Sequence, residues 1–182
     1  MVRDREEVTG VLLVGGGSTR FGSPKALAAF EGRTLGERAY SVLREAFERV
    51  MAVGKEGDAL PLPFPVFDDG SDERATIVGV AASLRLAETD LCVVLPTDMP
   101  FVSAQLLRSL GEAAAGVDAA VVQTGPLPGA YRRTALPVLE RRIAAGKLGL
   151  RDALAELDHR IVEASTEELK NVNTVEDLPA GS

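Results

Sequence analysis

The sequence predicts an α/β protein, a single three-layer α/β/α domain with a mostly parallel sheet. Short apolar runs, several of them rich in valine, alternate with stretches whose apolar residues recur at helical spacing. The runs are apolar throughout, which is typical of parallel strands with helices on both faces. The length of 182 residues suits one domain, so we expect residues 1–182 to form a single unit.

The elements follow in order along the chain. Strands are predicted at residues 11–14, 50–53, 65–67, 91–95 and 119–122, because each run is too short for a core helix. Helices are predicted at residues 35–47, 77–84, 104–110, 135–145 and 150–157 from their apolar spacing. Ser103 is the expected N-cap of the third helix. The proline-rich segment 60–65 lies between two predicted strands, so we interpret it as a stiff loop.

Composition excludes several classes of chemistry. With one cysteine (Cys92) and one histidine (His159), the chain can form neither a disulfide framework nor a Cys/His zinc site. A net charge of −7 disfavours a general nucleic-acid binder. No apolar run reaches about 18 residues and the N-terminus is charged, so we expect a cytoplasmic protein without a membrane segment. Cys92 is expected to be buried and His159 to be a surface residue.

A glycine-rich segment follows the first predicted strand. It contains three consecutive glycines, Gly15, Gly16 and Gly17. Their free N–H groups can form an anion-binding concavity, and Arg20 and Lys25 add positive charge. No carboxylate occurs between residues 8 and 30, so an acidic chain carries a cationic loop suited to a phosphorylated ligand. The spacing fits neither the P-loop nor the dinucleotide fingerprint. The alternative is a tight turn with solvated basic side chains.

Three further polar features follow strands or lie near the end of the chain. Asp98 comes directly after the apolar run 91–95, where a single carboxylate can hold Mg²⁺ together with substrate phosphates. An ordinary turn aspartate is the alternative. Asp68 begins an acidic stretch after the third strand, most of which we interpret as a solvated turn. Asp68 is the member nearest to the strand end and the one that could reach a ligand hydroxyl or base. Asn171 and Asn173 are two amides that helix capping does not explain.

Three motifs together resemble a known family, the molybdenum cofactor guanylyltransferases within the nucleotidyltransferase superfamily. Residues 13–25 are similar to L-A-G-G-x-S-x-R-(M/F)-G-x-x-K at every defined position except Val14. Residues 98–100 resemble the D-(M/T)-P strand end, and residues 171–178 match N-x-N-T-P-E-(D/E)-L except for Val175. The motifs occur in the family's order and span nearly the whole chain. The resemblance implies a Rossmann-like sheet of the nucleotide-diphospho-sugar transferase type.

The resemblance also implies a reaction, in which GTP and molybdopterin give the guanine dinucleotide cofactor and pyrophosphate. Leu13, Val14 and Gly15 would lie against guanine and ribose, and the N–H groups of Gly16 and Gly17 would reach the phosphates. The implied nucleotide-binding set is Leu13, Val14, Gly15, Gly16, Gly17, Lys25, Asp68 and Asp98. The nucleotide would occupy the half at about residues 8–100 and molybdopterin the half at about residues 101–178.

The implied catalytic residues are Arg20, Lys25 and Asp98. Lys25 would stabilise the charge that develops at the α-phosphorus, Arg20 would assist the leaving pyrophosphate, and Asp98 would bind Mg²⁺, the implied cofactor. Asn171 and Asn173 would bind the pterin phosphate or complete the metal shell. Phosphoryl-group transfer requires mainly positioning and charge neutralisation, so the scarcity of histidine and cysteine is consistent with it. Transient contact with molybdate-insertion proteins or molybdoenzymes would follow, and no nucleic acid or membrane partner is implied.

The chain departs from the family where the base would bind. Val14 replaces alanine, residues 75–79 (Ala75-Thr76-Ile77-Val78-Gly79) retain only the last glycine of G-P-L-A-G, and Val53-Gly54 stands where an asparagine-containing turn is common. The alternatives are a molybdopterin cytidylyltransferase, in which alanine tends to replace Gly16, and a sugar-phosphate nucleotidyltransferase, which is usually longer. A non-catalytic nucleotide-binding regulator would not be expected to retain Lys25 and Asp98, and a structural module would need neither feature.

Overall fold

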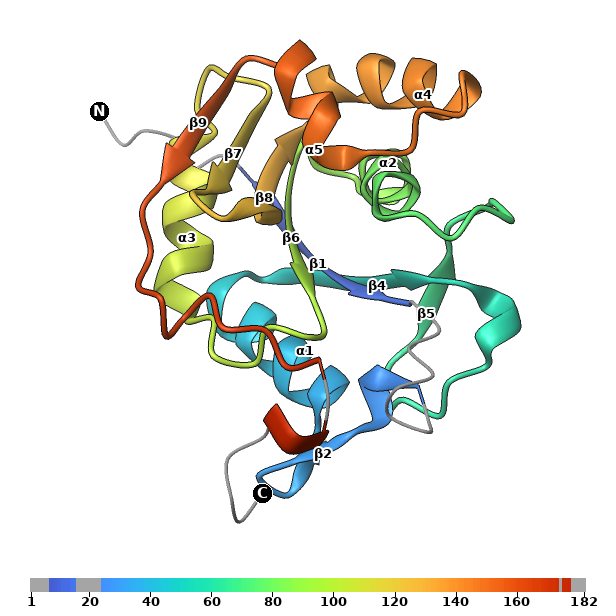
Figure 1. Ribbon diagram of the computed structural model, residues 1–182, viewed down its shortest axis with the longest axis vertical. Helices are drawn as coiled ribbons and strands as arrows, with labels where there is room; N and C mark the ends of the chain where they lie inside the picture. Colours follow the sequence, from blue (N-terminus) through green and yellow to red (C-terminus); the bar gives the residue numbers. More distant parts are fainter. Residues whose placement is uncertain (1–6, 16–23, 174, 178–182) are drawn as a thin grey trace.

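The computed structural model describes residues 7–15, 24–173 and 175–177. Its centre is a seven-stranded sheet in the order β5-β4-β1-β6-β8-β7-β9 (Figure 1). The strands are β1 (Val8–Val14), β4 (Arg49–Gly54), β5 (Val66–Asp68), β6 (Leu91–Pro96), β7 (Ala119–Val122), β8 (Gly125–Arg132) and β9 (His159–Val162). Only β8 runs antiparallel to its two neighbours, β6 and β7, and the other pairs are parallel. The predicted mostly parallel α/β fold is confirmed.

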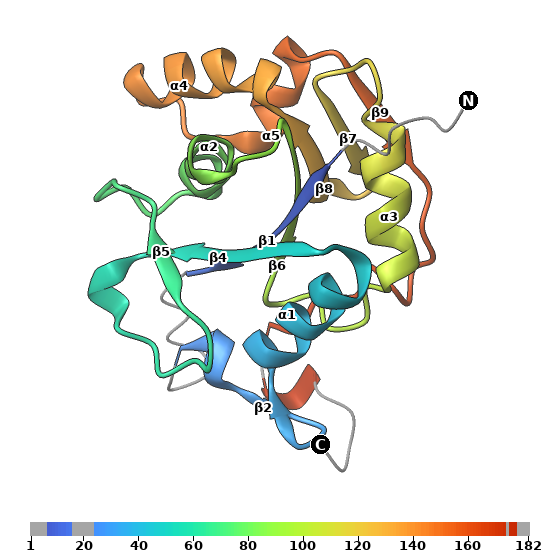
Figure 2. The same ribbon diagram turned by 180° about the vertical axis from the view of Figure 1, so that it is seen from behind.

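Helices cover both faces of the sheet and form the two outer layers. Figures 1 and 2 show α1 (Leu35–Ala46) and α3 (Ala104–Ala113) on one face. The helices α2 (Thr76–Leu86), α4 (Leu136–Ala144) and α5 (Leu150–Ala153) lie on the other. Alternate residues of the central strands supply the two cores. Leu12 and Val93 pack toward α1 and α3, whereas Val11 and Val94 pack toward α2 and α4.

Helix starts follow the local sequence. The side-chain hydroxyl of Thr34 accepts a hydrogen bond from the Glu37 N–H, and the Glu37 carboxylate accepts one from the Thr34 N–H, so a capping box starts α1. The Thr34 N–H is the main cause that lowers the pKa of Glu37. Ser103 caps α3 as predicted, accepting from the Leu106 N–H at 3.1 Å. α2 lacks a polar face because α4 covers the side turned away from the sheet, and residues 77–84 are all buried.

Short elements complete the chain. A two-stranded ribbon, β2 (Ala29–Phe30) with β3 (Arg33–Thr34), projects beyond the sheet next to α1. The 3-10 turns are η2 (Lys25–Leu27), η3 (Glu56–Asp58), η4 (Arg133–Ala135), η5 (Leu154–Glu156) and η6 (Val175–Asp177). Within the described part of the chain, no helix is long and apolar enough to cross a membrane.

All five predicted strands and all five predicted helical segments are present, and residues 60–65 form the expected loop. Two strands of the main sheet were not predicted. β8 contains two prolines and lacks a continuous apolar run, and β9 is a four-residue edge strand that begins with the exposed polar residues His159 and Arg160. Both strands form because neighbouring β6 and β7 supply hydrogen-bonding edges, which a local pattern does not show.

The register of β1 and β4 makes a steric prediction at Gly54. A Cβ atom there would lie 2.1 Å from the Val14 carbonyl oxygen, whereas a Cβ at Gly57 would meet nothing within 4 Å. We expect Gly54→Ala to lower the free energy of unfolding by about 2 kcal/mol or more, and the matched control Gly57→Ala to change it by less than about 0.5 kcal/mol. Urea denaturation measures both. Equal stability of the two variants would contradict the close approach of β1 and β4 at this register position.

Candidate active site

The carboxyl ends of β1, β4 and β6 surround a cavity of about 330 Å³. The chain passes from β1 through α1 to β4 on one side, and from β5 through α2 to β6 on the other, so the strand order reverses at β1. Open α/β sheets bind ligands at such a reversal. The lining consists mainly of residues at strand ends and around the start of α2, together with Lys25 of η2 and Leu127 of β8. Its members are Leu13, Val14, Gly15, Lys25, Val53, Gly54, Lys55, Asp69, Arg74, Ala75, Thr76, Gly79, Pro96, Thr97, Asp98 and Leu127.

Lys25 and Asp98 meet in this cavity although 73 positions separate them. The Lys25 Nζ lies 3.5 Å from Asp98 Oδ2, and the two side chains are 16% and 26% exposed. Lys25 starts η2 directly after Pro24, and Asp98 lies in the turn that follows β6. The cavity therefore carries a cation and a carboxylate side by side, each still accessible to a ligand.

The C-terminal asparagine segment, residues 171–173, contacts the turn that carries Asp98. The Val172 N–H donates to the Asp98 carbonyl oxygen at 2.8 Å, and the Val172 side chain is fully buried. Asn171 and Asn173 flank it and are exposed. The Asn173 N–H donates to the Asp177 carboxylate at 2.9 Å. The structure thus brings the two asparagines next to the turn that carries Asp98.

A small hydrophobic cluster joins the three motifs. Its members come from the segments around Lys25, Asp98 and Asn171, and they are Ala28, Phe30, Leu35, Phe101 and Val172. The rings of Phe30 and Phe101 meet edge to face at 5.8 Å. Arg38 lies over the Phe30 ring, with its guanidinium carbon 4.7 Å from the ring centroid, and its Nε donates to the Pro100 carbonyl oxygen at 2.9 Å. Arg38 therefore links α1 to the Asp98 turn.

The glycine-rich segment enters the cavity through its first residues. Val14 is buried, and Leu13 and Gly15 line the cavity beside it. A Cβ at Gly15 would meet no atom of the described residues within 4 Å, so these residues leave space for a ligand above this backbone. Gly16, Gly17 and Arg20 lie outside the described residues.

The acidic stretch after β5 is arranged differently from the sequence-based expectation. Asp68 is exposed, accepts a hydrogen bond from the Glu56 N–H at 3.2 Å and does not line the cavity. Asp69 lines the cavity instead, with its side chain only 7% exposed. Successive side chains along an extended segment point to opposite sides, and this alternation separates the two carboxylates.

The cysteine and the histidine take no part in the site. Cys92 is fully buried on β6 as predicted, and burial raises the pKa of its thiol to about 12, so no thiolate forms near neutral pH. His159 is an exposed residue of β9, at the opposite edge of the sheet from β5. Among the described residues, no three His, Cys, Asp or Glu side chains cluster closely enough to hold a metal ion by themselves.

Comparison with known proteins identifies the family. The MobA-like NTP transferase domain matches residues 10–161, more than four-fifths of the chain. This chain belongs to the MobA-like NTP transferase family. It is therefore a nucleotidyltransferase, in agreement with the resemblance of its three motifs.

Individual relatives carry related names. The transferase is 32% identical over 187 residues to a probable molybdenum cofactor guanylyltransferase from Pelotomaculum thermopropionicum, covering 94% of this chain and 90% of that protein. A protein of the same name from Flavobacterium johnsoniae is 28% identical over 181 residues, covering 95% of each. The fold matches that of the Archaeoglobus fulgidus molybdopterin-guanine dinucleotide biosynthesis protein A with a TM-score of 0.80 at 24% identity, covering 93% and 94% of the two chains.

The structure also places residues in the cavity of this transferase that the sequence patterns did not indicate. These residues are Lys55, Asp69, Arg74, Thr97 and Leu127. The sequence could have indicated Lys55 as a site residue, because it is the first charged residue after the apolar run of β4 and follows a glycine. No feature of the sequence indicated Leu127, because it reaches the cavity only through β8, the antiparallel strand that was not predicted.

The link between α1 and the Asp98 turn yields a prediction for Arg38. Arg38→Met should lower the free energy of unfolding by about 1–2 kcal/mol, because the Pro100 carbonyl and Glu31 lose a charged donor. It should also slow nucleotidyl transfer about tenfold or more, since the Asp98 turn loses its support. Arg44→Met, an exposed position on the same helix, is the matched control. Unchanged transfer in a folded Arg38→Met protein would show that the turn does not need this support.

Proposed function

We propose that this nucleotidyltransferase transfers GMP from GTP to molybdopterin, forming the guanine dinucleotide cofactor and releasing pyrophosphate. The observation that carries the proposal is the meeting of Lys25 and Asp98 in one cavity, with the 171–173 segment hydrogen-bonded to the turn that carries Asp98. The names of the relatives supply the substrates. Every cavity-lining residue except Leu127 comes from residues 13–98, which supports nucleotide binding in that half. We assign the binding of the acceptor to residues 101–178.

The residues present fit a magnesium ion. Mg²⁺ in nucleotide enzymes uses one or two carboxylates and takes its other ligands from phosphates and water. Asp98 supplies one carboxylate, partly exposed in the cavity and separated from Lys25 by 3.5 Å rather than by a short ion pair. Bound there, the ion would neutralise charge on the phosphates of the nucleotide. Asp98 is the residue that would hold it, and Asn173 is a candidate for a further oxygen ligand.

Different residues of the site would position the nucleoside and the phosphates. Leu13, Val14 and Gly15 would support the nucleoside from the end of β1, and the N–H groups of Gly16 and Gly17 would reach the phosphates. Lys25 would neutralise the α-phosphoryl oxygens. A terminal phosphate oxygen of molybdopterin attacks the α-phosphorus while the bond to the bridging oxygen of pyrophosphate breaks. The attacking oxygen already carries charge, so the reaction needs no general base.

Two further contacts belong to the proposal. Arg20 would assist the leaving pyrophosphate, and Asn171 with Asn173 would hold the pterin phosphate beside Asp98. Because Asp69 lines the cavity and Asp68 does not, we assign the acidic nucleotide contact to Asp69 rather than to Asp68.

The choice of base is the first test. The protein, Mg²⁺ and molybdopterin are incubated with each of the four nucleoside triphosphates, and pyrophosphate release is measured. We expect turnover with GTP and its loss when EDTA removes the metal. Turnover with CTP alone would contradict the guanine assignment and identify the protein as a cytidylyltransferase. Turnover only with a sugar phosphate as acceptor would overturn the molybdopterin assignment.

The roles of Lys25 and Asp98 give the second test. Lys25→Ala and Asp98→Ala should each lower the turnover rate about 10²-fold or more, because each removes a preorganised charge from the transition state. Lys147→Ala and Asp152→Ala, exposed residues of the same charges, serve as controls. Turnover near the wild-type rate in both active-site variants would show that the reacting phosphates bind elsewhere.

A further inference from the structure

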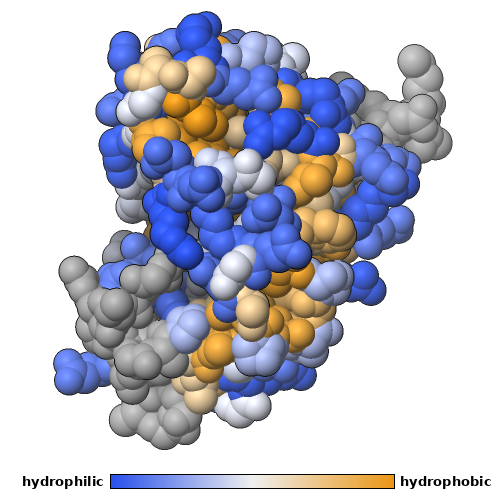
Figure 3. All heavy atoms as spheres, turned by 90° about the vertical axis from the view of Figure 1, so that its right-hand side faces the viewer, coloured by the Kyte–Doolittle hydropathy of each residue, from blue (hydrophilic) through white to orange (hydrophobic). Residues whose placement is uncertain are grey.

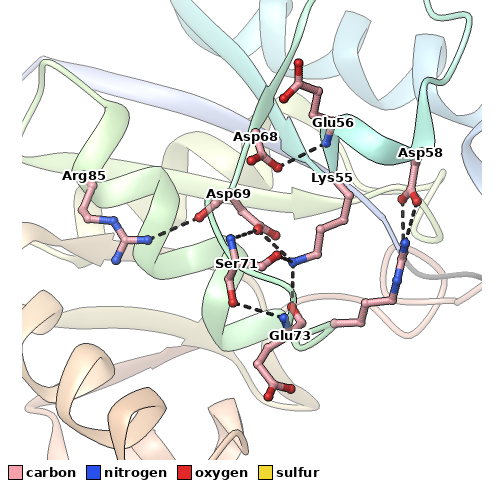
Figure 4. Close-up of polar contacts among 9 residues, drawn as sticks. Lys55, Glu56, Asp58, Asp68, Asp69, Ser71, Glu73 and Arg85 are labelled. Atoms are coloured by element: carbon pink, nitrogen blue, oxygen red, sulfur yellow. Dashed lines mark hydrogen bonds and ion pairs between the residues drawn. The ribbon is translucent and has the colours of Figure 1, made fainter.

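Lys55, directly after β4, sits at the centre of a polar cluster on the β5 side of the cavity. Its Nζ donates to Asp69 Oδ1 at 2.8 Å, to the Ser71 carbonyl oxygen at 2.5 Å and to the Glu73 carbonyl oxygen at 2.7 Å (Figure 4). The Lys55 and Asp69 side chains are 13% and 7% exposed, so the pair is shielded from solvent. One side chain therefore ties β4 to three points of the segment between β5 and α2.

The three acceptors use the whole hydrogen-bonding capacity of Lys55. A lysine ammonium group has three N–H donors, and each has a protein partner at short distance. Binding a phosphate would require the loss of one of these bonds. Lys55 is thus arranged to hold the loop rather than to contact the triphosphate.

The loop held by Lys55 forms one wall of the cavity. Asp69, Arg74 and Ala75 line the cavity, and α2 begins directly after them. Further bonds stabilise the same segment. Ser71 N–H donates to Asp69 Oδ1 at 3.0 Å, and Arg74 forms a bidentate pair with Asp58 whose hydrogen bonds are the main cause of the lowered pKa of Asp58. Figure 3 shows the side of the molecule that lies at the right in Figure 1, where β5 is found. Hydrophilic residues cross the middle of this surface, with hydrophobic areas above and below.

The cluster also orients the Asp69 carboxylate. Lys55 and the Ser71 N–H both bind Oδ1, whereas Oδ2 has no hydrogen-bond partner within the described residues. A carboxylate oxygen in this position can accept hydrogen bonds from a ligand that carries N–H donors. The strand order places Asp69 and Lys55 on the opposite side of β1 from Asp98, so the phosphates and the Asp69 carboxylate lie at different sides of the cavity.

We infer that Lys55 is a positioning residue that sets nucleobase selectivity, by holding Asp69 and the β5–α2 loop against the base. The inference rests on the proposed function, because it places the phosphates at Lys25 and Asp98 and thereby leaves the β4–β5 side for the base. The ligand class is a purine or pyrimidine whose N–H groups face Asp69.

The test compares nucleotide binding by the intact chain and by Lys55→Met. Isothermal titration calorimetry with Mg²⁺ and each of the four nucleoside triphosphates gives the dissociation constants. We expect the preferred nucleotide to bind about tenfold more weakly and the others to change about threefold or less, because only the preferred base loses a directed contact. Lys147→Met, which removes an exposed lysine, should retain the wild-type order and spread of affinities.

A second variant disturbs the same loop without removing a charge. Gly70 has a φ of +74° and nothing within 4 Å of its missing Cβ, so Gly70→Ala strains the loop but introduces no clash. It should reduce the preference among nucleotides in the same direction as Lys55→Met, and amide hydrogen exchange should accelerate over residues 70–75 in both. If Lys55→Met does not fold, Gly70→Ala alone decides.

The outcomes separate this inference from the proposed function. A folded Lys55→Met or Gly70→Ala protein with the wild-type ratio of dissociation constants overturns the inference. Equal affinity of the wild-type chain for all four nucleotides also overturns it, since no preference then exists. Pyrophosphate release with molybdopterin tests the proposed function independently, because the binding ratios need no acceptor.

Discussion

The position of Asp98 depends on a small hydrophobic cluster outside the main sheet. Asp98 lies in a turn, where a strand no longer holds the backbone. The cluster around Phe30, Phe101 and Val172 fastens that turn to the ribbon that follows Lys25 and to the C-terminal segment. Hydrogen bonds to the Asp98 and Pro100 carbonyls reinforce it. Apolar burial thereby brings a lysine and an aspartate from distant parts of the chain within 3.5 Å of each other, and two asparagines beside them.

The two sides of the cavity are held by different forces. On the β6 side, burial of aromatic and aliphatic groups supports Lys25 and Asp98, whose own charges remain accessible. On the β5 side, a shielded ammonium group and a carboxylate organise the loop, and Lys55 is occupied by protein acceptors. Nucleotidyl transfer depends on positioned reactants and on charges directed at the reacting phosphates, and a cavity with accessible charges on one side and a fixed loop on the other can supply both.

Much of the fold followed from the sequence because its central strands and helices have strong local patterns. β1, β4 and β6 each contain a continuous apolar run, and Ser103 and the apolar spacing after it define the start of α3. β8 and β9 lacked such patterns, and each pairs with strands distant in sequence. In the site, Lys25 and Asp98 stood out as charges beside a glycine-rich loop or a strand end. Asp69 did not stand out from Asp68, because the difference between them depends on which side chain faces inward. The charge of Lys55 directly after β4 was visible, but the groups that it binds were not.

The sequence alone determined the class of protein and its principal charges. Short apolar runs that alternate with helical patterns indicate an α/β sheet, and three sequence motifs indicate the family. Both can be recognised from the sequence because they depend on residue types and short spacings. Tertiary structure decided which of two adjacent aspartates lines the cavity, where the C-terminal asparagines lie and what Lys55 binds. These properties depend on strand register and on packing between segments far apart in the chain. Physical contact across such separations is set by the sum of burial and hydrogen bonding over the whole fold, which no local stretch of sequence contains.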